Sequence, residues 1–223
     1  MSHVKPRPSY EVPGLQPVFE AAEGRMGFVP NSMRTMAHMP QLPLAFAGLV
    51  NVVFGGDLKA LMASMVDRLP EPEDAEENLP PGLVQLIAFA VSLAAGCRYC
   101  QAHTSHSAHR AGEEAAKLDA VLDYERSPLF SAAERAALAL AFAAGSVPNE
   151  SGPRHFERLR KHYTERQIVQ IVAVIAVFGF LNRWNDTLAT ELEAMPKEFA
   201  ATALGGIDWR VGKHGKVSGQ PRR

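Results

Sequence analysis

The stretch LVQLIAFAVSLAAGCRYC, residues 83–100, decides the fold. Its first part is apolar on nearly every face, and a helix that is apolar all round is a buried one. Pro80 and Pro81 suit the first turn of such a helix, where a missing N–H costs nothing. The pattern therefore predicts a buried helix over 82–95. Gly96 ends or bends it, and a second helix runs from Cys97 to about residue 111, where Gly112 stops it.

Helix signals dominate the rest of the chain, and no convincing alternating strand pattern is present. Capping boxes at Ser131-Ala132-Ala133-Glu134 and Thr164-Glu165-Arg166-Gln167 predict helix starts. Residues 69–81, rich in proline and acidic residues, read as a solvated linker. The sequence predicts an all-α chain of about eight or nine helices, over residues 14–25, 33–38, 44–54, 58–68, 82–95, 97–111, 113–122, 131–144 and 168–193.

Two of the predicted helices share length and apolar character, those over 82–95 and 168–180. Packed antiparallel, they would form a central helix hairpin. With 223 residues the chain suits one domain. We expect a flexible N-terminal arm over 1–14, a single all-α domain over 15–200, and a C-terminal extension over 201–223 with a disordered end.

Composition narrows the function classes. The formal net charge is −1, from 23 basic and 24 acidic residues, so no basic face for nucleic acid is expected. The N-terminal residues contain no apolar signal core and no run that could cross a membrane, which predicts a cytoplasmic protein. Two cysteines in a cytosolic chain favour catalysis, redox sensing or metal binding over a structural disulfide.

The segment Cys97-Arg98-Tyr99-Cys100 is a C-x-x-C motif at a predicted helix start. The helix dipole lowers the pKa of a thiol placed there, and a second thiol one turn away can convert an oxidised sulfur into a disulfide. His103 follows Cys100 by three residues and is a candidate proton partner; His106 could extend the relay.

Two other interpretations of this segment remain open. Two cysteines and two histidines could supply four zinc ligands, although one short helix cannot easily wrap a metal ion. Alternatively, the cysteines are buried helix residues and the histidines lie on the surface.

The motif and its approach helix resemble the carboxymuconolactone decarboxylase and alkylhydroperoxidase D superfamily, in particular its peroxidase-related branch. The resemblance rests on residues 83–92, on Gly96-Cys97-Arg98-Tyr99-Cys100 and on His103-Thr104, with weaker support from residues 27–31 and 180–188. It implies an all-helical fold that assembles as trimers or hexamers. It also implies that Cys100 attacks a peroxide and Cys97 resolves the product.

This sequence departs from the family pattern at two positions. Twelve residues before Cys97, where the family has a glutamate, stands Gln85, which cannot take a proton. Four residues after Cys100 stands Thr104; the histidine is one position earlier, at 103, which turns its side chain by about 100° around a helix. Asp186, at the end of the second apolar helix, could replace the missing carboxylate.

The resemblance thus implies a thiol-dependent peroxidase-like oxidoreductase that cycles between dithiol and disulfide. Cys100, Cys97, His103, Gln85 and His106 are the expected site residues, and no metal or organic cofactor is expected. The expected partners are a hydroperoxide substrate, an external dithiol reductant and further copies of the chain; neither nucleic acid nor membrane is expected. The alternatives are a redox sensor or non-redox relative with little peroxidase turnover, or a carboxymuconolactone decarboxylase-type lyase; the presence of both cysteines argues against the lyase.

Overall fold

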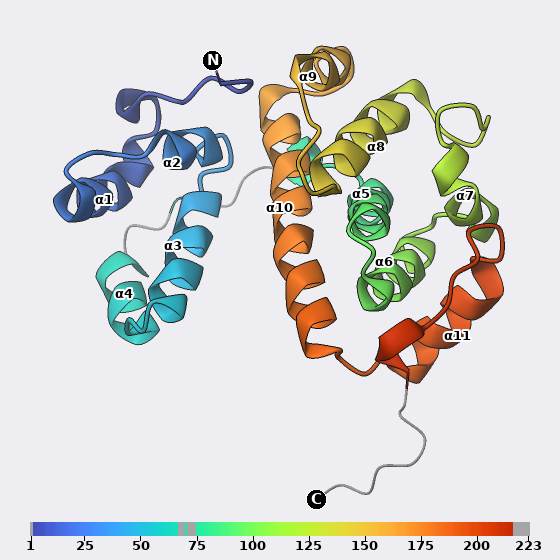
Figure 1. The fold of residues 1–223 in the computed structure, drawn as a ribbon. Coiled ribbons are helices and arrows are strands. Elements are labelled where there is room, and N and C mark those ends of the chain that lie inside the picture. Colours follow the sequence, from blue (N-terminus) through green and yellow to red (C-terminus); the bar gives the residue numbers. More distant parts are fainter. Residues whose placement is uncertain (1, 67–69, 71–74, 216–223) are drawn as a thin grey trace, which may run out of the picture. The chain divides into compact units, whose positions relative to one another are not determined.

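The computed structural model describes residues 2–66, 70 and 75–215, and every regular element in that part of the chain is a helix (Figure 1). The predicted all-α class is confirmed. The α-helices are α1 Gln16–Met26, α2 Asn31–Met36, α3 Leu42–Val53, α4 Leu58–Met65, α5 Pro81–Ala94, α6 Arg98–Arg110, α7 Ala115–Asp119, α8 Ala132–Gly145, α9 Pro153–Leu159, α10 Glu165–Leu188 and α11 Ala194–Ala203. Short 3-10 turns lie at Ser9–Glu11, Pro13–Leu15, Ala75–Glu77, Val121–Asp123 and, as η6, Gly212–His214.

The chain forms two compact units. The first contains residues 1–78 and 164–170, and the second contains 79–163 and 171–223. The single domain over 15–200 stays a prediction. Part of the predicted linker, and the tail end for which disorder is predicted, lie outside the described residues.

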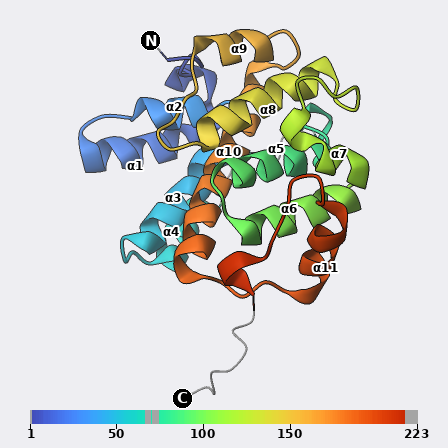
Figure 2. The same cartoon turned by 45° about the vertical axis from the view of Figure 1, so that its right-hand side comes forward.

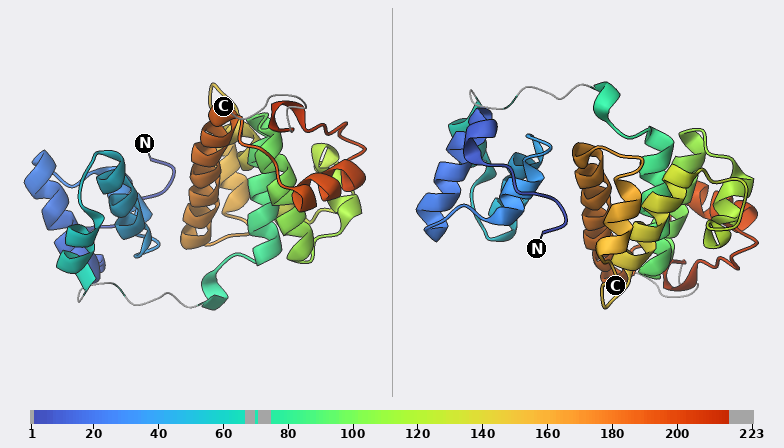
Figure 3. Two further views of the ribbon diagram at one scale, coloured as in Figure 1. Left: turned by 90° about the horizontal axis from the view of Figure 1, so that it is seen from below. Right: turned by 90° about the horizontal axis from the view of Figure 1, so that it is seen from above.

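The first unit packs helices α1 to α4 around an apolar core (Figure 3). Residues of the predicted N-terminal arm take part, since Val12 is buried in this core beside Leu15. The other buried members are Val18, Phe19, Ala22, Met33, Ala37, Leu44 and Met65.

The second unit is built on α5, the helix predicted from the opening stretch. Its side chains are buried on nearly all sides, which is the pattern that the apolar sequence predicts. It packs against α6 and α8, and α6 packs in turn against α11 (Figures 1 and 2). Helix α6, which carries the C-x-x-C motif, is therefore held between the central helix and the C-terminal part of the chain.

The turn between α5 and α6 places the two cysteines. Gly96 has φ 76°, a left-handed conformation that favours glycine. Cys97 follows as the N-cap of α6, and its N–H donates to the Ser92 carbonyl at 3.2 Å. The side-chain amide of Gln101 donates to the same carbonyl at 3.1 Å. These bonds fix the first turn of α6, so both thiols lie at its N-terminal end.

Helix α10 differs from the prediction at its C-terminal end. The predicted helix continues to residue 193, whereas α10 ends at Leu188, and Ala189 adopts a left-handed φ of 49°. Glu193 is instead the N-cap of α11, and Pro196 lies in the first turn of that helix, where proline is tolerated. By length and hydropathy α10 could cross a membrane, but the core helix of a soluble protein meets the same criterion.

Candidate dithiol site

Both cysteines are free thiols, and both are buried. Cys97 is 0% exposed and Cys100 is 3% exposed, and the two side chains are hydrogen-bonded to each other. The side-chain amide of Asn185, on α10, also lies 3.5 Å from Cys100 Sγ and can donate to it. The structure therefore pairs the two sulfurs in the way that the C-x-x-C spacing predicts.

The two thiols share their protons unequally. The hydrogen bond with Cys100 lowers the pKa of Cys97 to about 6, although burial acts in the opposite direction. The same hydrogen bond, together with burial, raises the pKa of Cys100. Near neutral pH the negative charge is therefore on Cys97, while Cys100 keeps its proton. The N-terminus of α6 stabilises this charge.

A pocket of about 460 Å³ opens onto Cys100. Cys97 does not line it, so Cys100 is the thiol that a small molecule meets first. One part of the wall is polar and the other is aromatic or aliphatic. The polar lining comes from Gln85, His103, Thr104, Ser107 and Asn185, and the apolar lining from Tyr99, Phe178, Leu181 and Trp184.

His103 has a carboxylate partner that is distant in sequence. Its Nε2 lies 2.7 Å from Oε2 of Glu193, and the Tyr99 hydroxyl donates to Oε1 of the same carboxylate at 3.1 Å. Although burial raises the pKa of Glu193, hydrogen bonds from its own backbone N–H and from His103 and Tyr99 outweigh burial and lower it. The rings of His103 and Tyr99 pack against each other with centroids 4.4 Å apart and a tilt of 30°.

The structure brings together four of the five predicted site residues. Cys100, His103 and Gln85 line one pocket, with Cys97 behind Cys100. His106 is not among the lining residues; its ring packs against Phe199 of α11, with centroids 5.5 Å apart. The catalytic roles of all five stay predictions.

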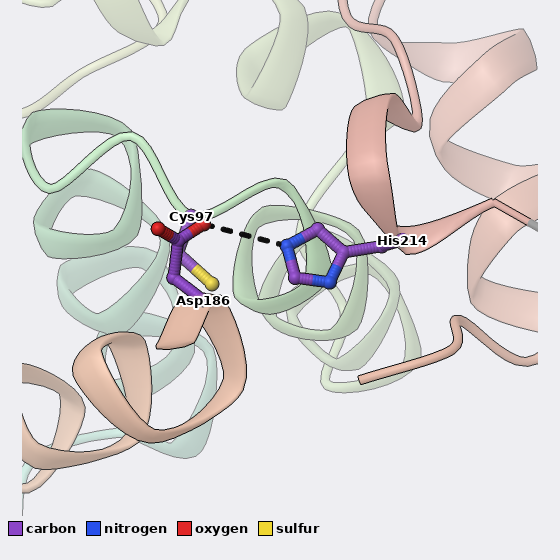
Figure 4. Close-up of side chains that lie close together, drawn as sticks. All are labelled: Cys97, Asp186 and His214. Carbon is purple, nitrogen blue, oxygen red and sulfur yellow. Dashed lines mark ion pairs between the residues drawn. The ribbon is translucent and has the colours of Figure 1, made fainter. Parts of the chain in front are cut away.

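Cys97 also belongs to a second group of side chains, with Asp186 and His214 (Figure 4). Sγ of Cys97, a carboxylate oxygen of Asp186 and a ring nitrogen of His214 all lie within 4.8 Å of one another. Lys213 pairs with Oδ2 of Asp186 at 2.7 Å and lowers the pKa of that carboxyl. Asp186 therefore lies beside Cys97, whereas the carboxylate beside His103 belongs to Glu193.

Sequence reasoning missed three residues of this site: Asn185, Glu193 and His214. Asn185 stands in a polar group at the end of an apolar helix, and that pattern was a usable signal. Glu193 and His214 follow irregular turns, and nothing in their local sequence marks them. Glu193 reaches His103, and His214 reaches Cys97, because α11 and η6 pack on α6.

The fold and the site together define an all-helical protein with a buried dithiol beside a small pocket. A family model, the carboxymuconolactone decarboxylase family, matches residues 60–143. The crystal structure of a cysteine-to-alanine variant of the debrominase Bmp8 in complex with 2,3,4-tribromopyrrole is similar, with 34% identity, a TM-score of 0.55, and coverage of 91% of this chain and 98% of that one.

Two bacterial relatives of uncharacterised function also match. YdfG of Bacillus subtilis is 32% identical over 103 residues, which span 45% of this chain and 67% of YdfG. YnjA of Escherichia coli is 26% identical over 146 residues, which span 66% of this chain and 76% of YnjA. The chain belongs to the carboxymuconolactone decarboxylase family.

Proposed function

We propose that the protein is a dithiol oxidoreductase that reduces an electrophilic small molecule through Cys100 and Cys97. The leading substrate class is hydroperoxides. The observation that carries the proposal is the position of Cys100, which faces the pocket while its hydrogen-bonded partner Cys97 lies behind it. A cytoplasmic location suits such a cycle, because reductants there keep thiols reduced. An external dithiol would return the disulfide to the reduced state.

In the first step Cys100 reacts with the hydroperoxide and passes its proton to Cys97. Cys100 Sγ attacks the terminal oxygen of the hydroperoxide, the O–O bond breaks, and the Cys100 proton passes to the Cys97 thiolate. Protonated His103, held by Glu193 at 2.7 Å, gives its proton to the leaving alkoxide, which departs as an alcohol. Cys100 is now a sulfenic acid.

The second step closes the disulfide. Cys97 attacks the sulfenic sulfur, and the hydroxyl group leaves as water with the Cys97 proton. One hydroperoxide and two thiols have then become an alcohol, water and one disulfide. Gln85 cannot take a proton, and in this scheme it contributes a hydrogen bond from the pocket wall.

A second substrate class, halogenated aromatic rings, is favoured by the aromatic part of the pocket wall. Tyr99, Phe178 and Trp184 offer faces on which a flat ring can stack. The likeness to Bmp8, which binds 2,3,4-tribromopyrrole, supports this alternative. His103 would protonate the ring carbon, Cys100 would attack the halogen, and Cys97 would displace halide. One aryl halide and two thiols then become an arene, hydrogen halide and a disulfide.

Stopped-flow consumption of cumene hydroperoxide and of a brominated pyrrole by the reduced chain tests both classes. We expect the Cys97→Ser variant to react once and to leave a dimedone-reactive sulfenic acid at Cys100. The Cys100→Ser variant should consume neither compound. Consumption by Cys100→Ser at the wild-type rate would disprove the proposal.

Two outcomes of this assay would point to the alternatives. A reversible Cys97–Cys100 disulfide without turnover of either compound would identify a redox sensor. An activity that survives in the double Cys97→Ser/Cys100→Ser variant would identify a non-redox enzyme such as a lyase.

We also propose that the chain forms a homo-oligomer, in keeping with the trimers or hexamers that the resemblance implies. Large apolar side chains on α10 are exposed in the single chain, and burial between copies would remove them from water. Light scattering of the intact chain tests this proposal, and a monomer would contradict it. The exposed residues in question are Val172, Val177, Phe180, Trp184 and Leu188.

A further inference from the structure

The group formed by Cys97, Asp186 and His214 combines three kinds of metal ligand from three separate elements. Cys97 is the N-cap of α6, Asp186 lies on α10 and His214 lies in η6 (Figure 4). A thiolate, a carboxylate and an imidazole within 4.8 Å of one another form a set that suits zinc. The objection that one helix cannot wrap a metal ion does not apply to this group.

The ring of His214 is oriented so that Nε2 can bind a metal ion. Its Nδ1 lies 2.8 Å from the Thr190 carbonyl, which can only accept, so Nδ1 carries a hydrogen and Nε2 is the nitrogen that a metal ion would bind. His214 is 0% exposed, and its Nε2 has no hydrogen-bond partner. A histidine that donates its other ring N–H to a backbone carbonyl is the usual arrangement at metal centres.

The distance between His214 and Asp186 fits a shared ion better than a direct hydrogen bond. Nε2 lies 3.5 Å from Oδ1 of Asp186, beyond the usual range for a hydrogen bond. Tetrahedral zinc with bonds of about 2.0–2.2 Å to nitrogen and oxygen sets these atoms roughly 3.3–3.5 Å apart. The other carboxylate oxygen is held by Lys213 at 2.7 Å, which orients Oδ1 toward the group.

The position is closed to water on the sides of Cys97 and His214, which are both 0% exposed. The Asp186 side chain is 43% exposed and offers a path of entry.

We propose that Cys97, Asp186 and His214 bind a zinc ion with a fourth position open to water, and that the ion holds the dithiol in its reduced state. Zinc occupies the lone pair of Cys97 Sγ that disulfide formation needs. The site is then regulatory, and its binding step does not rest on the proposed reduction chemistry.

Cobalt titration of the tag-free, chelator-treated, reduced chain tests the binding step. We expect one equivalent of Co²⁺ to give a near-ultraviolet sulfur-to-cobalt charge-transfer band and intense visible bands of tetrahedral cobalt. One equivalent of Zn²⁺ should displace them. Absence of stoichiometric binding by the wild-type chain would overturn the proposal.

Variants separate this site from nearby binders. Cys97→Ser should lose the charge-transfer band, while Cys100→Ser should keep it; the reverse result would overturn the assignment. Asp186→Asn, at a partly exposed position, should weaken Co²⁺ binding at least roughly 10-fold. His214→Gln should do the same, provided that circular dichroism shows it folded.

A matched control addresses the histidines of α6. The double variant His106→Gln/His109→Gln removes two imidazoles outside the group and should bind Co²⁺ with wild-type affinity. Loss of binding in this variant would show that α6 alone holds the ion and would overturn the proposal.

The regulatory part has its own readout. Oxidation of the two thiols by diamide should be at least roughly 10-fold slower in the zinc-loaded chain than in the zinc-free chain. Equal rates would remove the regulatory role and leave the binding result standing. This readout uses diamide instead of a substrate, so a failure of the proposed function does not affect it.

Discussion

At the level of single residues, the presence of Gln85 raises the question of which residue provides a carboxylate to His103. The family pattern puts a glutamate at that position, and the structure instead supplies a carboxylate from Glu193, which is 90 residues away from His103. Gln85 still lines the same pocket, where it can orient a bound molecule but cannot exchange a proton. The sequence marks the cysteines and His103 by spacing, but Glu193 depends on where α10 ends.

Substitutions at His103 and Glu193 should separate proton transfer from positioning. We expect His103→Gln to slow Cys100 oxidation by a hydroperoxide about 100-fold, since it removes the proton donor. Glu193→Gln should slow it roughly 10-fold, because the imidazole remains but loses its charged partner. Stopped-flow rates across a pH series measure both, and only a change in proton transfer should alter the pH profile.

Glu198→Gln is the matched control, since it changes an exposed glutamate of the same helix, α11. It should react at the wild-type rate. If Glu193→Gln were as fast as this control, Glu193 would have no part in the reaction.

At the level of elements, the first residues of helices were easier to predict from the sequence than the last residues. Both capping boxes are present: Ser131 with Glu134 opens α8, and Thr164 and Gln167 exchange hydrogen bonds at the start of α10. The end of α10 has no such signal, because residues 189–195, which follow Leu188 directly, include neither glycine nor proline. Ala189 adopts a left-handed conformation there, which is uncommon for alanine and could not be predicted from the residue type.

The turn that joins α5 to α6 can be tested at Gly96. A Cβ at this position would meet nothing within 4 Å, so only the positive φ opposes a substitution. We expect Gly96→Ala to lower the free energy of unfolding by about 1 kcal/mol, and Gly96→Asn by less, because asparagine tolerates this conformation. Urea unfolding followed by circular dichroism measures both.

Gly179 gives a control with the opposite sign. It lies within α10, and a Cβ there also meets nothing within 4 Å. Gly179→Ala should raise the free energy of unfolding by about 0.5–1 kcal/mol, because alanine is the better helix former. If both alanine variants were stabilised, the left-handed turn would not be what constrains Gly96.

At the level of the whole molecule, the second unit assembles its site from segments far apart in sequence. Cys97 and Cys100 begin α6, Asn185 and Asp186 close α10, and His214 lies near the end of the described chain. Helical periodicity predicts which faces are buried, but not which helix ends meet. The dithiol and its pocket-facing histidine could therefore be predicted, and the polar end of α10 marks Asn185, whereas Glu193 and His214 could not be predicted.

An ion-pair network in the same unit should make stability depend on pH. Lys117 of α7 contacts both Glu113 and Glu134, and all three side chains are at least four-fifths buried. Burial raises the pKa of Glu134, but hydrogen bonds from Lys117 and Ser131 outweigh it and lower that pKa. Burial lowers the pKa of Lys117, but its bonds to the two glutamates outweigh it and raise that pKa.

The sign of each shift sets its pH window. The contribution of Glu134 is complete above the unfolded pKa of about 4.3 and is lost as pH falls through the lower folded pKa. The contribution of Lys117 is complete below about 10.4 and is lost as pH rises through the higher folded pKa. The network is therefore fully formed across the neutral range.

Lys117→Met should lower the free energy of unfolding at about pH 7 by roughly 2 kcal/mol, because it leaves Glu113 and Glu134 without their cation. At about pH 3 the difference between variant and wild type should shrink, since a protonated Glu134 no longer needs that cation. Urea unfolding at both pH values measures the two differences. Lys197→Met, at an exposed position on α11, should change neither. A loss for Lys117→Met that is equally large at both pH values would show that Lys117 acts through the packing of its aliphatic stem instead of its charge.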